Sequence, residues 1–321
     1  MAERIPVCES KTATTPDDFP MGWYSVARSH ELQVGEVKRV YAFERELALY
    51  RSRSGVAAVQ DAFCPHLGAH LGVEGRVVGE TLACPFHGWR FDNSGKCVEI
   101  PYCDEIPDRA RVRMWPTDEA NGEIYMWYHP ENTAPQYELP RISELDDSQW
   151  TPARMAEFEV PAHIQDIAEN TCDPVHFQYV HNQLETPESE VTIDDDGRRL
   201  YLRADARHTA RPHMLNVTLH QPGLALVRTS YAPEAEMIVY NSAQPIDAHT
   251  TLLRWSLSVR REIEDLAGDE VIRGIIDGIK QDYPIWANKV HRRRPIFCKE
   301  DHTLVTYRKW VRQFYPDAAE A

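Results

Sequence analysis

Short apolar runs separated by turn residues occupy the chain from Gly22 to about Trp127. The runs at 39–43, 47–50 and 55–59 are apolar, with β-branched or aromatic members, and predict strands. A stretch rich in proline and asparagine at 129–140 predicts a linker. We therefore expect a loose polar arm over residues 1–20 and a small all-β domain over residues 21–130.

The remainder, residues 131–321, mixes two periodicities. Residues 162–182 predict an interrupted helical segment, and strand patterns return over 195–262. From 268 to 290 apolar residues recur at helical spacing, which predicts a long amphipathic helix. The expected fold class is therefore α+β, with an all-β domain followed by a larger domain that contains helices and strands.

Charge and cysteine usage narrow the function classes. The formal net charge of −15 would repel phosphate backbones, so we expect no nucleic-acid partner. No apolar run is long enough to span a bilayer, and residues 1–20 lack the apolar centre of a signal peptide, so we expect a cytoplasmic protein. The seven cysteines are odd in number and irregularly spaced, which favours metal ligation over a disulfide framework.

Two short segments, 64–68 and 84–89, each combine one cysteine with one histidine. Cys64 and His66 form Cys-x-His, and Cys84 and His87 form Cys-x-x-His. A tetrahedral zinc site could use these four ligands, but zinc sites commonly pair two cysteines on one loop. One Cys and one His from each segment suit a [2Fe–2S] cluster. In such a cluster one iron binds the two cysteine sulfurs and the other binds the two histidine ring nitrogens.

A second constellation begins at Asp173. His176 and His181 are five residues apart, so an ideal helix would separate them by about 140°. Pro174 removes a backbone donor and Asp173 is a good N-cap, so we expect a break there and a short, distorted second helix that presents both histidines. Two histidines at this spacing can also be ordinary surface or core residues, but two histidines and a carboxylate are the usual ligands of reactive ferrous iron.

The carboxylate is expected on the helix predicted at 268–290. Asp282 follows Ile279 by three residues and precedes Trp286 by four, which puts it on the apolar stripe, whereas Asp277 points to the opposite side. The other members of that stripe are Ile272, Ile275, Ile276 and Val290. A buried aspartate is costly unless it is paired or bound to metal, so Asp282 is the predicted third ligand. Pro284 is expected to bend the helix.

The segment 64–92 resembles the cluster-binding loops of Rieske oxygenases, and Asn170–His181 is similar to their Asn-x-x-Asp-x-x-His-x-x-x-x-His pattern. Further segments resemble the group of 3-ketosteroid 9α-hydroxylase oxygenase components and cholesterol 7-desaturases. These segments are 88–91, 95–97, 100–102, 281–289 and 310–315. The resemblance implies an N-terminal Rieske [2Fe–2S] domain and a C-terminal helix-grip (START-like) catalytic domain with an antiparallel sheet and mononuclear Fe(II).

The resemblance also implies a function. The chain would be the terminal oxygenase of a multicomponent system and would use O2 and electrons from a ferredoxin or flavin-dependent reductase. It would hydroxylate or otherwise oxidise an apolar ring substrate, and a steroid-like substrate is favoured. The alternative within enzymes is an aromatic or alkaloid substrate that is demethylated or desaturated. Asp173 would carry electrons between a cluster histidine of one subunit and an iron histidine of its neighbour, which implies a homotrimer. Two other classes stay open, a non-catalytic electron carrier and an inactive lipid-binding module.

Overall fold

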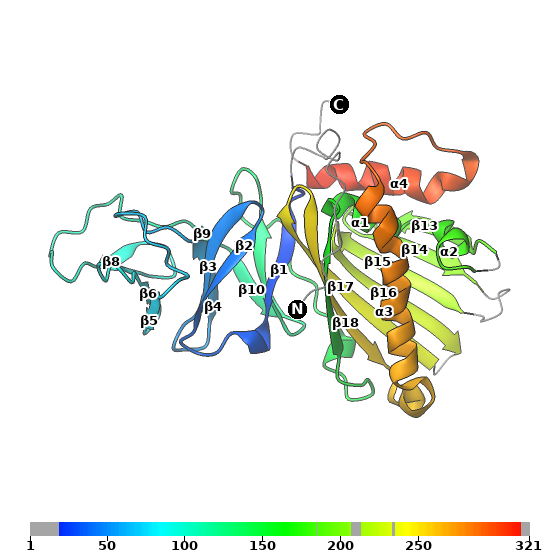
Figure 1. Cartoon of the computed structure of the whole chain (residues 1–321), viewed down its shortest axis with the longest axis horizontal. Helices are drawn as coiled ribbons and strands as arrows, with labels where there is room; N and C mark the ends of the chain where they lie inside the picture. Colours follow the sequence, from blue (N-terminus) through cyan, green and yellow to red (C-terminus); the bar gives the residue numbers. More distant parts are fainter. Residues whose placement is uncertain (1–18, 184, 207–212, 233–234, 316–321) are drawn as a thin grey trace. The chain divides into compact units, whose positions relative to one another are not determined.

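The computed structural model describes residues 19–183, 185–206, 213–232 and 235–315 (Figure 1). The chain divides into two compact units, Gly22–Arg141 and a second unit that contains the residues from Ile142 onward together with 19–21. Among the described residues, no helix is long and apolar enough to cross a membrane.

The first unit consists of three antiparallel sheets, in the strand orders β1-β11-β10, β2-β3-β4-β9 and β5-β6-β7-β8. The strands are β1 (Gly22–Arg28), β2 (Val37–Ala42), β3 (Arg45–Arg51), β4 (Ala57–Asp61), β5 (Arg76–Val78), β6 (Thr81–Ala83), β7 (Arg90–Phe91), β8 (Cys97–Glu99), β9 (Met114–Trp115), β10 (Thr117–Ala120) and β11 (Glu123–Tyr128). The predicted strands at 39–43, 47–50 and 55–59 are confirmed, because β2, β3 and β4 contain most of their residues.

One apolar core of this unit packs the β5–β8 sheet against β3 and β4. Leu71, Leu82 and Phe91 are fully buried there, and the side chains of Cys64 and Cys84 belong to the same cluster. Burying an aliphatic or aromatic side chain of this size contributes about 1.5–3 kcal/mol, so this small core holds the two cysteine-bearing loops against a common base.

The second unit contains one seven-stranded antiparallel sheet in the order β12-β18-β17-β16-β15-β14-β13. Its strands are β12 (Arg154–Val160), β13 (Glu188–Ile193), β14 (Leu200–Asp205), β15 (Met214–Gln221), β16 (Leu224–Ala232), β17 (Ala235–Asp247) and β18 (Thr250–Val259). Its helices are α1 (Ile164–Asn170), α2 (His176–Tyr179), α3 (Glu264–Asn288) and α4 (His302–Trp310). Single 3-10 turns of the chain lie at Ser29–Glu31, Ser143–Leu145, Arg261–Ile263, Lys299–Asp301 and Val311–Phe314.

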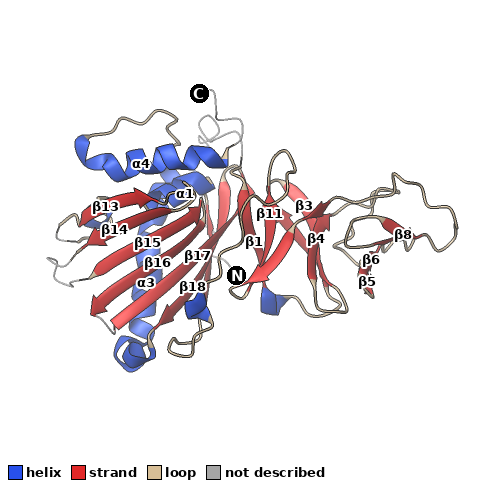
Figure 2. Ribbon diagram, turned by 180° about the vertical axis from the view of Figure 1, so that it is seen from behind, coloured by secondary structure: helices blue, strands red, loops and turns tan. Residues whose placement is uncertain are grey.

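Helix α3 lies across one face of this sheet in both views (Figures 1 and 2). Ile272, Ile279 and Trp286 recur every seven residues and are 3–6% exposed, so one stripe of the helix faces the sheet. Ile272 packs with Val239 of β17 and Leu257 of β18. The predicted α+β class, with an all-β unit followed by a helix-grip unit, is therefore confirmed.

The predicted stripe extends too far at its C-terminal end. Val290 lies beyond α3 and is 37% exposed, because the backbone turns to an extended conformation at Lys289. The helix continues through Pro284 for another turn and ends at Asn288. Whether Pro284 bends it stays a prediction.

Candidate metal centres and their relatives

Two loops of the first unit share one backbone geometry. The amide of Cys64 donates to the carbonyl of Ala69, and that of Gly68 donates back to Cys64, each at 2.9 Å. In the second loop the amide of Cys84 donates to Trp89 and that of Gly88 donates to Cys84, at 2.8 and 3.1 Å.

Both loops need a glycine at the same place. Gly68 and Gly88 have φ near +74°, a left-handed conformation that other residues adopt at a cost. A side chain at Gly88 would in addition approach Pro101 to 3.0 Å. The spacing of cysteine and glycine in the sequence therefore encodes two copies of one turn.

The donor atoms of these loops fall into two pairs. Cys64 and Cys84 are 3% and 1% exposed and their thiols are neighbours, while the rings of His66 and His87 lie 4.7 Å apart between centroids and are half-buried. Burial, reinforced by the neighbouring Cys84, raises the pKa of the Cys64 thiol to about 12. A metal would therefore have to displace a proton on binding.

This arrangement fits a two-iron cluster better than zinc. The buried Nδ1 atom of His66 has no hydrogen-bond partner, as expected of a ring nitrogen that awaits a metal. Four ligands of one zinc ion lie at about 2.0–2.3 Å from it, which would bring all four donor atoms together. Among the described residues, the one group of three or more His, Cys, Asp and Glu side chains close enough to share an ion lies elsewhere, in the second unit.

The group in the second unit consists of His176, His181 and Asp282, and the segment with its two histidines follows the end of α1. The chain breaks between Asn170 and His176, as predicted, and resumes as the four-residue helix α2. The carboxylate Oδ1 of Asp173 accepts from the amides of Val175 and His176 at 3.1 and 3.3 Å, which caps the new turn. Helix α2 ends at Tyr179, so His181 lies beyond it and is free of the regular helical spacing that would separate the two histidines.

The two imidazoles are held by their Nδ1 atoms. His176 Nδ1 hydrogen-bonds to the carbonyl of Asp173, and His181 Nδ1 lies 3.0 Å from Oε1 of Gln281. An acceptor at Nδ1 fixes the proton there and leaves Nε2 as the ligand atom. Gln281 was not identified from the sequence, because nothing in its local pattern shows that it meets a residue 100 positions earlier.

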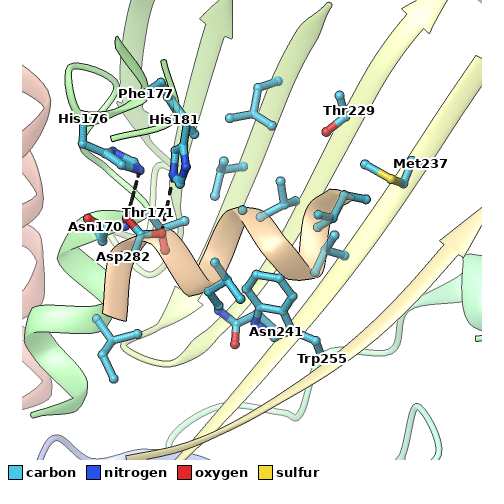
Figure 3. Close-up of a pocket in the computed structure, with 18 of the residues that line it drawn as sticks. Asn170, Thr171, His176, Phe177, His181, Thr229, Met237, Asn241, Trp255 and Asp282 are labelled. Carbon is cyan, nitrogen blue, oxygen red and sulfur yellow. Dashed lines mark hydrogen bonds and ion pairs between the residues drawn. The ribbon is translucent and has the colours of Figure 1, made fainter. Parts of the chain in front are cut away.

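Asp282 faces both Nε2 atoms (Figure 3). Its two carboxylate oxygens lie 4.0 Å from His176 and 3.5 Å from His181, and the three ligand atoms are all within 4.8 Å of one another. Two ligands of one ion, each about 2 Å from it, are up to ~4 Å apart, and both distances from Asp282 to the histidines lie within that limit, so the residues suit a single metal. Burial lowers the pKa of His176, whereas at His181 the bonds to Asp282 and Gln281 outweigh burial and raise it.

Asp277 lies on the other face of α3. Its side chain is 68% exposed and pairs with Lys280, whereas Asp282 is 5% exposed. The placement of these two aspartates follows the sequence argument, in which only Asp282 shares the stripe of Ile279 and Trp286.

A cavity of about 360 Å³ adjoins this group, within the roughly 300–1,000 Å³ of small-molecule sites. In Figure 3 the two histidines and Asp282 lie at one end of it, and Thr229 and Met237 at the other. The aliphatic part of its wall comes from β15 to β18 and α3, through Leu215, Val217, Val227, Val239, Leu253, Ile275 and Ile279. Asn241 also lines the cavity, and its amide oxygen is buried without a hydrogen-bond partner.

A buried ion network connects α1 to the chain that follows α3. Asp166 of α1 lies 3.0 Å from Nδ1 of His291 and 3.4 Å from Nζ of Lys289. Arg308 of α4 lies 3.4 Å from Nε2 of His291 and pairs with Glu169 of α1. Since α1 leads to His176 and α3 carries Asp282, this network fixes the two segments that supply the ligands.

Asp282→Ala should remove the mononuclear metal, because one of the three candidate ligands is lost. The purified variant is expected to contain at least tenfold less iron at this site, with the absorption spectrum of the cluster unchanged. Asp277→Ala, on the exposed face of the same helix, is the matched control and should retain full iron. If metal analysis showed the reverse, the face assignment of α3 would be wrong.

Asp166→Asn should destabilise the second unit in a pH-dependent way. Burial alone would raise the pKa of Asp166, but His291 and Lys289 outweigh it and lower the pKa from 3.8 to about 2. At roughly 1.4 kcal/mol per pH unit this corresponds to about 2 kcal/mol. Because the pKa is depressed on folding, the contribution is complete above pH 4 and is lost as the pH falls toward 2.

Urea unfolding of wild type and Asp166→Asn measures this at pH 7, 5, 4 and 3. The difference in unfolding free energy should be constant down to pH 4 and shrink below it. The exposed Asp277→Asn should show a small difference at every pH. A gap for Asp166→Asn that stays constant to pH 3 would contradict the role of its charge.

Comparison with known proteins identifies the family of this chain. The family profile described as Rieske [2Fe-2S] domain matches residues 22–116, and that described as 3-Ketosteroid 9alpha-hydroxylase C-terminal domain matches residues 126–315. Cholesterol 7-desaturase nvd 1 of Ciona intestinalis is 32% identical over 328 residues, which cover 94% of this chain and 70% of that protein. A probable 3-ketosteroid-9-alpha-monooxygenase oxygenase component of Rhodococcus rhodochrous is 31% identical over 330 residues, covering 96% and 82%.

A solved structure shows the same fold at lower identity. The caffeine-bound NdmA of Pseudomonas putida CBB5 superposes with a TM-score of 0.77 at 22% identity, over 90% of this chain and 89% of that one. Three observations agree on the family of this chain. Two family profiles match it one after the other, relatives match it over nearly its whole length, and it contains two sets of side chains that suit metal ligation. The chain belongs to the Rieske non-haem iron oxygenases, O2-dependent monooxygenases with a [2Fe–2S] cluster and a mononuclear iron, in the group of the 3-ketosteroid 9α-hydroxylase oxygenase components and cholesterol 7-desaturases.

Proposed function

We propose that this chain oxidises an apolar polycyclic compound of the steroid type, as the terminal oxygenase of a multicomponent system. The observation that carries the proposal is the aliphatic cavity that ends at His176, His181 and Asp282. A wall of this kind binds a rigid hydrocarbon skeleton by burying its surface, and Thr229 and Asn241 add polar side chains to the lining. The two relatives named for steroid and cholesterol oxidation support the same substrate class.

In this proposal Cys64, His66, Cys84 and His87 hold the [2Fe–2S] cluster, and His176, His181 and Asp282 hold the iron. When bound, these centres supply stored electrons and the activation of dioxygen. The Nδ1 bonds orient both imidazoles so that Nε2 of each faces Asp282, and the apolar wall excludes water from the carbon to be oxidised. The proposed domains are the arm 1–20, the cluster domain 21–130 and the iron domain 131–321, in keeping with the two profile matches.

Electrons would come from a ferredoxin or flavin-dependent reductase. The surface near His66 and His87 carries exposed apolar side chains, among them Leu67, Phe86 and Tyr102, which are 60–65% exposed. Exposed apolar residues around a redox centre favour contact with another protein surface. The proposal includes a homotrimer, in which Asp173 passes electrons from the cluster of a neighbouring subunit, and a cytoplasmic location.

The second candidate is an aromatic or alkaloid substrate that is demethylated or desaturated. It is favoured by the caffeine-bound structural neighbour and by a cavity near the lower end of the usual size range. The two candidates differ in the size of the ring system that the cavity must accept.

The function is tested with purified protein, a surrogate ferredoxin and reductase, NADH and O2. A panel of four-ring steroids is expected to give a product with one added oxygen or two fewer hydrogens, detected by mass spectrometry. Cys84→Ser, which should lose the cluster signal in electron paramagnetic resonance, should give no product. Conversion of methoxybenzenes or N-methylpurines but of no steroid would establish the second candidate instead.

Asp173→Asn separates the electron path from helix capping. The cap uses Oδ1 of Asp173, and asparagine caps about as well, so the variant should fold and bind both metals normally. A neutral amide cannot bridge two imidazoles with two acceptor oxygens. Reduction of the cluster should stay fast, and its reoxidation by O2 with substrate should slow at least ~100-fold in stopped-flow single turnovers. Rapid reoxidation would leave capping as the only role of Asp173.

A further inference from the structure

Two glycines lie one turn apart near the middle of α3, in different surroundings. Gly278 lines the cavity, three residues after Ile275 and four before Asp282, while Gly274 is exposed and is not part of the cavity wall. Residues three and four apart share a face of a helix, so Gly278 occupies the helix surface directly next to the proposed iron ligand.

Neither backbone strain nor packing requires glycine at 278. A Cβ atom built there would meet no heavy atom within 4 Å, and its φ is not left-handed. The contrast with Gly75, Gly95 and Gly223 is clear, because a Cβ at those positions would approach a neighbouring atom to 1.9, 2.1 and 2.5 Å.

Glycine is also a poor choice for the helix itself. It loses more conformational freedom on folding than alanine, so a mid-helix glycine destabilises the element. What the residue provides at 278 is space, since the other positions of the same stripe carry Ile275, Ile279 and Trp286.

We propose that Gly278 is a specificity-determining residue, which exposes the backbone of α3 so that a flat fused-ring substrate can lie against the helix with one edge at the iron. The inference rests on the proposed function, because it assigns a shape to the same substrate. A bare helix surface between Ile275 and Asp282 accepts a rigid ring face, whereas a methyl or isobutyl group there would lift the ring system away from the ligands.

Binding is measured without O2 or reductase, so that it does not depend on turnover. The probes are progesterone, which has four fused rings, and anisole, which has one, and the readout is quenching of tryptophan fluorescence, since Trp255 and Trp286 line the cavity. Gly278→Ala should weaken progesterone binding roughly tenfold and Gly278→Leu ~100-fold or more, while anisole binding changes less than threefold. Both variants should keep wild-type iron and cluster content.

Gly274→Ala is the matched control on the same helix. Gly274→Ala and Gly278→Ala should both raise the melting temperature, by about 2–4 °C, because alanine is the better helix former in each case. Only Gly278→Ala should alter progesterone binding, and that combination of higher stability with weaker binding is not expected of a residue with a purely structural role.

The outcomes separate the two proposals. If wild type binds progesterone and Gly278→Leu binds it equally well, the role of Gly278 is overturned and the proposed substrate class stands. If wild type binds anisole and not progesterone, the polycyclic substrate class fails and the role of Gly278 fails with it.

Discussion

A carboxylate buried beside two imidazoles is the constraint on which the second unit depends. Removing Asp282 from water is costly unless a cation or hydrogen-bond donors compensate, and a metal ion held by Asp282, His176 and His181, as proposed, would supply that compensation. The three residues come from two segments that are separated in the sequence by strands β13 to β18. The fold must therefore bring two distant segments together for the three side chains to meet.

Two features of the protein meet that requirement. Each histidine is fixed through Nδ1, one by the backbone of Asp173 and the other by the neighbour of the aspartate it faces, Gln281. The charged network of Asp166 and His291 then connects α1 to the end of α3. Ligand orientation and ligand spacing are thus controlled by different interactions, so a substitution in one can leave the other intact.

The two loops with the paired Cys and His residues are positioned by a repeated backbone turn. One turn, with a cysteine at its start and a left-handed glycine four residues later, is used twice, and the two copies rest on a shared apolar core. The cysteines lie in that core while the histidines remain half-buried. A [2Fe–2S] cluster held by these loops, as proposed, would be protected on its cysteine side and more accessible on its histidine side.

Local chemistry explains what the sequence by itself determined. The strands of the first unit, the break at Asp173–Pro174, the paired Cys and His loops and the choice of Asp282 over Asp277 all follow from periodicity, turn chemistry and the cost of a buried charge. Family resemblance added the helix-grip fold, because no pattern within the chain specifies how seven strands are ordered around a helix.

Only the tertiary structure decided which distant residues meet. Gln281 reaches His181, His291 reaches Asp166, and Gly278 faces a cavity where its identical neighbour Gly274 faces solvent. Val290 is an example in which helical spacing misleads. Its spacing matches the apolar stripe of α3, but the helix ends before it. A sequence encodes the face on which a residue lies through its spacing from near neighbours. What lies opposite that face depends on long-range packing, which is a property of the whole fold.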